Sequence, residues 1–239
     1  DAMTKKRQIK IKNSNTKQVI KMIYLYEDSR QLTDSEAFFL YSAFPEAIRQ
    51  RIDEIKNRER KMERVTCYTL LVRALCEEYG LKKEEIRIEN GKYGKPLLTG
   101  MSEIFFNLSH SDSRAVCVTG RQENGIDLQK RISFQEKLKQ RICCDSEKKR
   151  IDCCHSEEEK DWMMTKIWTA KEAYLKKKGT GIREDLRFLE TEKEQEDFWY
   201  LNGETIKFWK RDQFILAVCS KEEMKTIKTV EFASLMRQV

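Results

Sequence analysis

The sequence has little glycine and proline, 9 and 2 among 239 residues, and it has no long apolar run. This shortage excludes a collagen-like, low-complexity or linker-dominated chain and indicates a compact globular protein. The longest apolar runs, such as Phe214 to Cys219, are far shorter than the roughly 18 residues that a membrane-spanning helix requires. The basic residues at positions 5 to 7 are followed by polar residues rather than by the apolar stretch of a secretory signal. We therefore expect a cytoplasmic protein that does not bind membranes.

Cysteine is also scarce, because 8 residues are far below the roughly 8 to 10% of a disulfide-stapled scaffold. Reduced thiols are therefore expected. The doublets Cys143-Cys144 and Cys153-Cys154, the second followed by His155, lack the C-x2-C spacing of zinc sites. They favour helical turns that carry small, partly buried thiols.

Positive charge is only slightly in excess, since 47 lysines and arginines against 40 acidic residues give a net charge of +7. The excess favours anionic partners, a condition that nucleic acid, phosphate-rich small molecules and acidic proteins all meet. A nucleic-acid-binding protein without catalysis is the alternative to an enzyme, and the arginine-rich segment 49–64 supports it. That segment contains no recognised nucleic-acid motif, and acidic residues interrupt it: Asp53, Glu54, Glu59 and Glu63.

Hydrophobic periodicity predicts the order of helices and strands. Residues 21–26 have the pattern of a strand buried on both faces, and the charged stretch after Pro45 that of a helix. Two apolar stripes at helical spacing predict two long helices, each ended by a glycine. The stripes are Tyr68, Val72, Leu75 and Tyr79 before Gly80, and Met164, Ile167, Trp168 and Leu175 before Gly179. The expected strands are 86–88, 104–106 and 114–119 after the first helix, and 186–189, 205–209 and 213–219 after the second.

The two parts of this pattern repeat one another. The tripeptide Ala-Val-Cys occurs at 115–117 and again at 217–219, each time at the end of a helix followed by strands. We therefore predict two similar α+β halves that meet near residues 120–124. At roughly 150 residues per domain, the length allows one large unit or two small ones.

Polar residues that a core would not need gather in three places. Tyr93 to Pro96 form a tight turn fixed by glycine and proline, with a lysine between them. Asn107 to Ser111 directly follow an apolar strand, and they place His110, one of only 2 histidines, among hydroxyls and an amide suited to phosphate oxygens. No G-x-S-x-G turn surrounds Ser109, so a nucleophile elbow is excluded there.

The third place combines a strand and a helix. In the strand 125–129, Asp127 and Gln129 share one face, while the apolar residues between them share the other. A carboxylate in a short apolar strand is costly unless it is paired or metal-bound. On the second long helix, Glu172 and Lys176 lie one turn apart, a spacing that alone would indicate only a surface salt bridge.

In this order, the motifs Tyr-Gly-Lys-Pro, Asn-Leu-Ser-His-Ser, Gly-Ile-Asp-Leu-Gln-Lys and Trp-Thr-Ala-Lys-Glu-Ala-Tyr-Leu-Lys resemble the 4′-phosphopantetheinyl transferase superfamily, in particular its monomeric, surfactin-synthetase-activating (Sfp) type. With a final Gly-x-Gly they span residues 93–181, and the arginine-rich segment after Pro45 also matches. The resemblance implies an α+β, pseudo-two-fold monomer of two similar halves, each a small, mainly antiparallel sheet packed on a long helix. Residues 20–120 would form the N-terminal half, and residues 121–222 the C-terminal half with the metal and catalytic motifs.

The resemblance implies transfer of the 4′-phosphopantetheine arm of coenzyme A to a serine of an apo acyl or peptidyl carrier protein, with release of adenosine 3′,5′-bisphosphate. Asp127 and Glu172 would bind Mg²⁺, a hard cation that takes carboxylate oxygens and completes its octahedron with phosphate and water. The ion would bridge the pyrophosphate and neutralise charge as the serine attacks the β-phosphate. The serine proton would go to Glu172, directly or through a metal-bound water, or to Lys176.

The resemblance also assigns the residues that would hold coenzyme A. They are Lys95, Pro96, Ser109, His110, Asp127 and Lys176, with Arg64 and either Arg49 or Arg51 at its 3′-phosphate. Gln129 departs from the pattern, because many relatives carry a second acid there. Its neutral amide would bind the metal directly, through water or not at all, and Mg²⁺ affinity would be lower. The intact Asp127, Glu172 and Lys176 count against a catalytically inactive scaffold of the same fold.

Overall fold

The computed structural model describes residues 22–222 and 226–237, apart from the side chains of residues 193 and 194. The helices are α1 (Asp34–Ser42), α2 (Glu46–Asp53), α3 (Arg58–Tyr79), α4 (Glu136–Ile142), α5 (Asp145–Asp152), α6 (Glu157–Lys178) and α7 (Phe232–Met236). The strands are β1 (Met22–Tyr26), β2 (Ile88–Asn90), β3 (Pro96–Leu98), β4 (Phe105–Ser111), β5 (Arg114–Gly120), β6 (Asn124–Lys130), β7 (Thr191–Gln195), β8 (Phe198–Leu201), β9 (Glu204–Arg211), β10 (Phe214–Ser220) and β11 (Thr226–Thr229). Short 3-10 turns are η1 (Ser29–Gln31), η2 (Lys83–Glu85) and η3 (Leu186–Phe188). No helix within the described ranges is long and apolar enough to cross a membrane.

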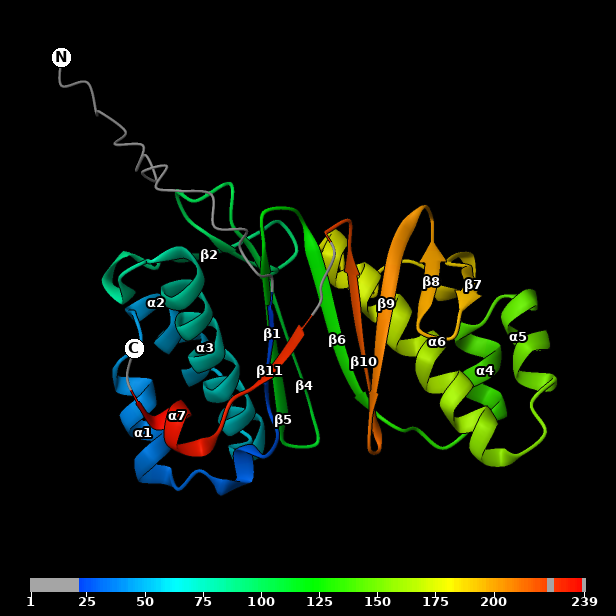
Figure 1. Cartoon of the computed structure of the whole chain (residues 1–239), viewed down its shortest axis with the longest axis horizontal. Helices are drawn as coiled ribbons and strands as arrows, with labels where there is room; N and C mark the ends of the chain where they lie inside the picture. The colour runs from blue at the N-terminus through cyan, green and yellow to red at the C-terminus, as the bar shows by residue number, and fades with distance from the viewer. Residues whose placement is uncertain (1–21, 223–225, 238–239) are drawn as a thin grey trace, which may run out of the picture.

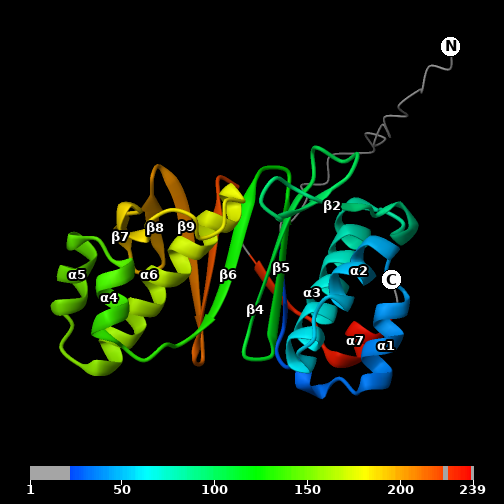
Figure 2. The same cartoon turned by 180° about the vertical axis from the view of Figure 1, so that it is seen from behind.

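Two sheets lie side by side in the middle of the molecule, and the helices cover their outer faces (Figure 1). One sheet has the strand order β11-β1-β5-β4, and the other has the order β6-β10-β9-β8-β7. Apart from the parallel pair β1 and β11, neighbouring strands in both sheets are antiparallel. Figure 2, from behind, shows α3 on the first sheet and α6 on the second. The predicted α+β class is confirmed, with two halves that each place a mainly antiparallel sheet on a long helix.

The two halves repeat the same order of elements. α3 and α6 each contain 22 residues, and each ends at a glycine in the left-handed region, with φ of 65° at Gly80 and 70° at Gly179. The strands β1, β5 and β4 of the first sheet correspond in order to β6, β10 and β9 of the second. One Ala-Val-Cys tripeptide lies on β5 and the other on β10, so the repeated letters mark equivalent strands.

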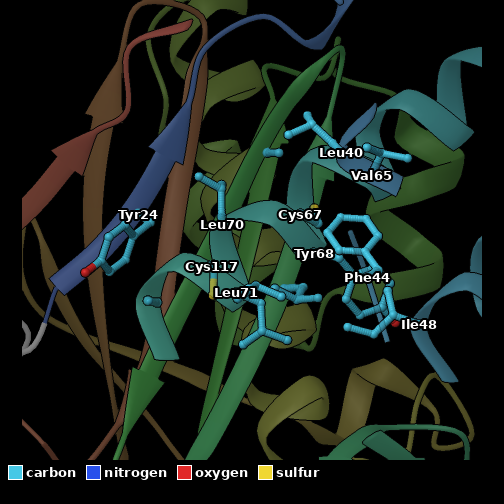
Figure 3. Packing of buried hydrophobic residues seen from close by; sticks show 14 of the residues in the cluster. Tyr24, Leu40, Phe44, Ile48, Val65, Cys67, Tyr68, Leu70, Leu71 and Cys117 are labelled. Atoms are coloured by element: carbon cyan, nitrogen blue, oxygen red, sulfur yellow. The ribbon is translucent and has the colours of Figure 1, made fainter. Parts of the chain in front are cut away.

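Strand β1 shows how the halves are joined. Successive side chains of a strand point to opposite faces of its sheet. Tyr24 belongs to the same buried cluster as α3 residues such as Leu70 and Tyr68 (Figure 3), whereas Ile23 and Leu25 belong to the cluster shared with the second sheet. The other buried residues between the sheets are Val116, Val118, Ile126, Leu128, Phe214, Leu216 and Val218. Because burial of one such side chain contributes roughly 1.5–3 kcal/mol, this shared cluster holds the halves together.

The chain after residue 222 returns to the first half. β11 pairs with β1, and Leu235 of α7 is buried in the cluster around α3. The sequence prediction ended the C-terminal half at residue 222 and did not include this strand and helix. Residues 20 and 21, at the expected start of the N-terminal half, and the basic segment 5–7 lie outside the described residues.

Two local predictions were wrong. Residues 186–189, expected as a strand, contain the turn η3, because the Asp185 carboxylate accepts the N–H of Arg187 and caps a 3-10 turn. Asn107 to Ser111, expected to follow a strand, are part of β4 itself and pair with β5 as far as Ser111. Polar side chains occupy this strand because they bond to the neighbouring sheet, as described next.

Candidate active site

The edge strands β4 and β6 are joined by side chains rather than by a backbone ladder. Three alternate residues of β4 accept backbone N–H groups from three alternate residues of β6. The acceptors Asn107 Oδ1, Ser109 Oγ and Ser111 Oγ bond to Ile126, Leu128 and Lys130, each at 3.1 Å. The motif Asn-Leu-Ser-His-Ser therefore fixes the register of one half against the other.

Gly125 fixes the contact between β6 and α6. A Cβ atom at this position would lie 2.0 Å from the carbonyl oxygen of Ala173 and 2.4 Å from the backbone nitrogen of Lys177. Only glycine permits this approach, since both neighbours are helix backbone. The close contact brings Asp127, two residues along β6, next to the turn of α6 that carries Glu172.

A cavity of about 380 Å³ opens where β4, β6, α3 and α6 meet. Its lining residues come from both halves: Arg64, Leu108, Ser109, His110, Asp127, Leu128, Gln129, Trp168, Glu172 and Lys176. The structure thus brings together seven of the residues that the resemblance assigned to substrate or metal, from positions far apart in the sequence.

Asp127, Ser109 and Lys176 form a closed triangle at the cavity wall. The Lys176 ammonium donates to Asp127 Oδ1 at 2.6 Å and to Ser109 Oγ at 2.8 Å, and the Ser109 hydroxyl donates to Asp127 Oδ1 at 2.9 Å. Ser109 also accepts the N–H of Leu128, so its one donor and both acceptor positions are used inside the protein. In this arrangement Ser109 orients the acid and the lysine.

Two carboxylate oxygens of residues that line the cavity have no hydrogen-bond partner in the described part of the chain. Asp127 Oδ2 and Glu172 Oε1 are buried, and neither has a hydrogen-bond partner among the described residues. Burial raises the pKa of Glu172, and the negative charge of Asp127 raises it further, while Lys176 opposes the shift. Buried polar atoms are nearly always hydrogen-bonded, so two unpartnered oxygens on residues that line one cavity indicate a place for a positively charged ligand.

A hard divalent cation fits these oxygens, because it takes few protein carboxylates and fills its other positions from substrate and water. Gln129 also lines the cavity, but its amide nitrogen donates to the carbonyl oxygen of Lys130 at 3.0 Å. Within residues 22–222 and 226–237, no group of three or more His, Cys, Asp or Glu side chains could hold a metal. The cavity therefore offers two carboxylates and one amide, and any metal there needs ligands from the substrate.

The 8 cysteines are free thiols, and burial raises the pKa of Cys143 to about 12.

Basic residues also line the cavity. Arg64 of α3 lines it, and beside Arg64 the imidazole of His110 lies with Nδ1 2.7 Å from Glu63 Oε2. Burial lowers the pKa of His110, and the charges of Arg64 and Lys176 lower it further. Carboxylates and cations thus line the same cavity, a combination of charges that suits a phosphate-bearing ligand.

Four assigned residues do not line the cavity. Lys95 donates to the carbonyl oxygens of Lys177, at 2.8 Å, and Asn124, at 3.3 Å, and burial lowers its pKa to about 8. The turn from Tyr93 to Pro96 thus holds the C-terminal end of α6, with Pro96 beginning β3. Arg49 pairs with Glu46 at 2.5 Å, and Arg51 bonds to Asn90.

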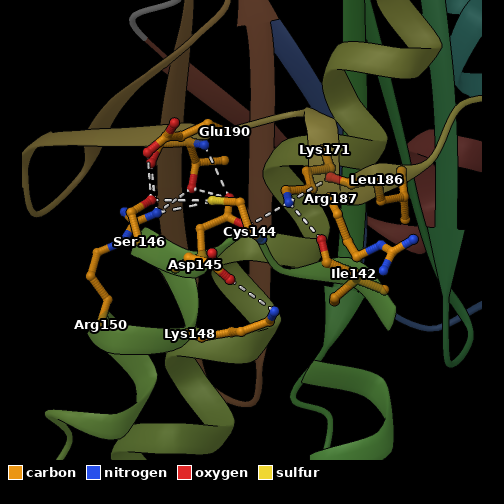
Figure 4. A network of polar contacts seen from close by, with 12 residues as sticks. Ile142, Cys144, Asp145, Ser146, Lys148, Arg150, Lys171, Leu186, Arg187 and Glu190 are labelled. Carbon is orange, nitrogen blue, oxygen red and sulfur yellow. Dashed lines mark hydrogen bonds and ion pairs between the residues drawn. The ribbon is translucent and has the colours of Figure 1, made fainter. Parts of the chain in front are cut away.

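Lys171, the residue before Glu172, has an entirely internal role. It is completely buried and donates to Glu147 Oε2 at 2.6 Å and to the carbonyl oxygens of Ile142, at 2.7 Å, and Leu186, at 2.9 Å (Figure 4). The other oxygen of Glu147 accepts from the N–H and hydroxyl of Thr191. These bonds fix the rotation of α6 about its axis and thereby the direction of Glu172.

Two residues in or beside the cavity were not assigned from the sequence. Trp168 lines the cavity one turn before Glu172 and two turns before Lys176, so the helical spacing already placed it on that face. Glu63 was counted only as an acid among arginines. Its contact with His110 depends on how α3 packs on β4, and no local sequence signal indicates it.

Comparison with known proteins agrees with this geometry. Residues 123–229 match the family model of the 4′-phosphopantetheinyl transferase superfamily. The chain is 28% identical over 114 residues to the 4′-phosphopantetheinyl transferase Sfp of Bacillus subtilis (strain 168), covering 47% of this chain and 50% of that protein. It is 25% identical over 164 residues to the 4′-phosphopantetheinyl transferase ffp of Bacillus subtilis, covering 68% and 72%. It is 33% identical over 109 residues to the 4′-phosphopantetheinyl transferase HetI of Nostoc sp., covering 43% and 46%.

The chain spans about half the length of two of these relatives and 72% of the third. The segment matched by the family model runs from β6 through α6 to β11 and contains Asp127, Glu172 and Lys176. The resemblance read from the motifs is confirmed: residues 123–229 match the model of the 4′-phosphopantetheinyl transferase superfamily, and the chain is similar to transferases of the Sfp type.

Proposed function

We propose that this protein transfers the 4′-phosphopantetheine arm of coenzyme A to a serine of an apo acyl or peptidyl carrier protein. The observation that carries the proposal is the pair of buried, unpartnered oxygens, Asp127 Oδ2 and Glu172 Oε1, on residues that line the same cavity as Arg64, His110 and Lys176. A pyrophosphate between a divalent cation and arginine or lysine side chains would meet complementary charge on both sides.

Asp127 and Glu172 would hold Mg²⁺, with Gln129 beside them at the cavity wall. When bound, the ion would supply Lewis-acid stabilisation of the negative charge that develops on the pyrophosphate oxygens. Lys176 and Ser109 hold Asp127 Oδ1 in place, so that Oδ2 is the oxygen left for the ion. Arg64 and His110, which line the same cavity, would bind phosphate oxygens of coenzyme A.

In the transfer step, the hydroxyl oxygen of the carrier serine bonds to the β-phosphorus while the bond from that phosphorus to the bridging oxygen breaks. The leaving group is adenosine 3′,5′-bisphosphate, and the serine proton needs an acceptor. Lys176 already donates to two internal oxygens, whereas Glu172 has a second carboxylate oxygen besides the Oε1 that would hold the metal, and burial raises its pKa. We therefore favour Glu172 over Lys176 as the proton acceptor.

Both halves contribute to this proposed site. Residues 20–120 would supply Arg64, Ser109 and His110, and residues 121–222 would supply the acids and Lys176. Because one chain completes the cavity, a monomer suffices, and a cytoplasmic setting would provide coenzyme A and carrier proteins. The nucleic-acid alternative gains less support, since arginines of its basic segment pair with acids of the same half, as Arg58 does with Asp34 at 2.7 Å.

Mass spectrometry of an apo carrier protein tests the proposal. The carrier is incubated with this protein, coenzyme A and Mg²⁺, and we expect its mass to rise by one phosphopantetheine. Glu172→Gln should leave the carrier in its apo form over the same time, whereas Glu157→Gln, at an exposed position on the same helix, should not. An unmodified carrier across acyl and peptidyl types, with folded protein, would contradict the proposed function.

A further inference from the structure

Glu63 is an acid of α3 with only 9% of its surface exposed, and the family motifs do not include it. Its Oε2 lies 2.7 Å from His110 Nδ1, and its Oε1 accepts the N–H of Ser113 at 2.8 Å. Both partners belong to the hairpin of β4 and β5, so the carboxylate is held from two directions. With one oxygen at His110 and the other at Ser113, this buried carboxylate is held in a fixed position behind the histidine that lines the cavity.

This contact determines which nitrogen of His110 a ligand can use. The Nδ1–H group donates a hydrogen bond to Glu63. Nε2 is therefore the nitrogen that remains for a ligand in the cavity lined by His110. In a neutral imidazole whose Nδ1 carries the proton, Nε2 is an acceptor and cannot donate to a phosphate oxygen. Only the imidazolium donates from both nitrogens at once.

The charges around the ring favour its neutral form while the cavity holds no anion. Burial is the largest cause of the lowered pKa of His110, followed by Arg64 of α3, with Lys176 of α6 acting in the same direction. Glu63 opposes them. A phosphate placed among these groups offsets the two cations and stabilises the imidazolium, so the ring gains a proton when the anion binds.

We infer that Glu63 is a positioning residue: by accepting Nδ1–H it directs Nε2 of His110 to a phosphate oxygen of coenzyme A, and binding of that phosphate takes up one proton from solvent at Nε2. The inference rests on the proposed function for the identity of the ligand. The pairing of Glu63 with His110 is independent of it. The affinity for coenzyme A should rise as the pH falls from the pKa of His110 in the complex to its pKa in the free protein. At lower pH the affinity should level off.

Nitrogen NMR of the two histidines tests the pairing directly. In the full-length protein labelled with ¹⁵N-histidine, His155→Gln removes the signal of the exposed histidine and so assigns His110. For the free protein near neutral pH we expect a protonated Nδ1 and a bare Nε2, and on addition of coenzyme A without metal we expect both nitrogens to become protonated. In Glu63→Gln the preference for a protonated Nδ1 should disappear, while Oε1 of the new amide can still accept from Ser113.

Calorimetry supplies the second readout. Coenzyme A should bind Glu63→Gln about tenfold more weakly than wild type near pH 6, and its affinity should vary less with pH. Glu59→Gln, one turn earlier on α3 and exposed, makes the same charge change and should match wild type. The unfolding midpoint of each variant is measured alongside.

Two results would overturn the inference: His110 nitrogen signals unchanged by Glu63→Gln, or a folded variant whose coenzyme A affinity stays within twofold of wild type at every pH. Failure of the proposed function is distinguishable, because the wild-type protein would then not bind coenzyme A at all. The dependence of the His110 tautomer on Glu63 in the free protein would still support the positioning role.

Discussion

Helix α6 carries two lysine–carboxylate pairs with the same 2.6 Å separation and different surroundings. Lys171 and Glu147 are both fully buried, and further hydrogen bonds engage both ends of the pair. Five residues later, Lys176 is 29% exposed, and its partner Asp127 keeps one buried oxygen without a partner in the described part of the chain. The first pair is saturated, because hydrogen bonds engage the lysine and both carboxylate oxygens. The second pair is incomplete, because Asp127 Oδ2 has no partner among the described residues.

A structural ion pair therefore differs from one that can bind a ligand in how fully its donors and acceptors are hydrogen-bonded, and not in the distance between the two charges. A buried ion pair is tolerable only if other hydrogen bonds satisfy its remaining donors and acceptors. Lys171 and Glu147 meet that condition, whereas Asp127 meets it only on one oxygen.

The largest expected effect comes from breaking the saturated pair. Lys171→Met leaves Glu147 buried without its cation and should lower the free energy of unfolding by about 3–5 kcal/mol. Adding Glu147→Gln should recover part of this loss, because no uncompensated charge remains. Chemical denaturation measures both variants, with Lys176→Met as the comparison at on the order of 1 kcal/mol. Equal losses from Lys171→Met and Lys176→Met would remove the distinction between the pairs.

Asp127→Asn and Glu172→Gln should lower the activity rather than the stability. We expect each to lower the transfer rate by about 10²-fold or more, which corresponds to about 2.7 kcal/mol, because each removes a carboxylate that would face the metal and the reacting phosphate. The unfolding midpoint should not fall for Glu172→Gln, since the change removes a buried, unpaired carboxylate. Near wild-type turnover at saturating Mg²⁺ in either variant would refute the metal assignment.

Arg64→Ala tests the basic wall and should have a smaller effect. Its proposed phosphate lies away from the reacting centre, so KM for coenzyme A should rise about tenfold while kcat stays within about twofold. Comparing coenzyme A with its 3′-dephospho form measures the contact, and Arg60→Ala, exposed one turn earlier on α3, is the matched control. If Arg64→Ala still distinguished the two substrates as wild type does, Arg64 would not contact the 3′-phosphate.

Gln129→Glu should have the smallest effect. A carboxylate stabilises Mg²⁺ more than an amide oxygen does in a partly buried site, so the Mg²⁺ concentration for half-maximal activity should fall a few-fold with little change at saturation. A Mg²⁺ titration at fixed coenzyme A and carrier measures it. An unchanged midpoint would place Gln129 away from the metal, as its bond to Lys130 already suggests for the free protein.

The central residues of the site could be predicted because their spacing is local. Strand alternation placed Asp127 and Gln129 on one face, and helical spacing placed Glu172 and Lys176 on another, and the structure brings these faces into one cavity. The two-half fold was predicted for a similar reason, since the long helices and the Ala-Val-Cys strands repeat as continuous segments. These patterns depend on backbone geometry, which short segments already specify.

The remaining parts depend on tertiary packing. Lys95 was assigned to the ligand, but it caps α6 in the other half, and this contact arises only when the turn before β3 meets the helix end. Glu63 was unassigned, because its partner His110 lies on a strand of distant sequence. β11 has only four residues, and its pairing with β1 depends on the return of the chain to the first half.

Calorimetric titration of coenzyme A, with and without Mg²⁺, tests most directly whether the unpartnered oxygens form the working site. For wild type we predict that Mg²⁺ strengthens binding at least tenfold, that the double variant Asp127→Asn and Glu172→Gln loses this dependence, and that Glu157→Gln keeps it. Binding of coenzyme A by wild type that is unaffected by Mg²⁺, or an equal Mg²⁺ dependence in the double variant, would contradict the account.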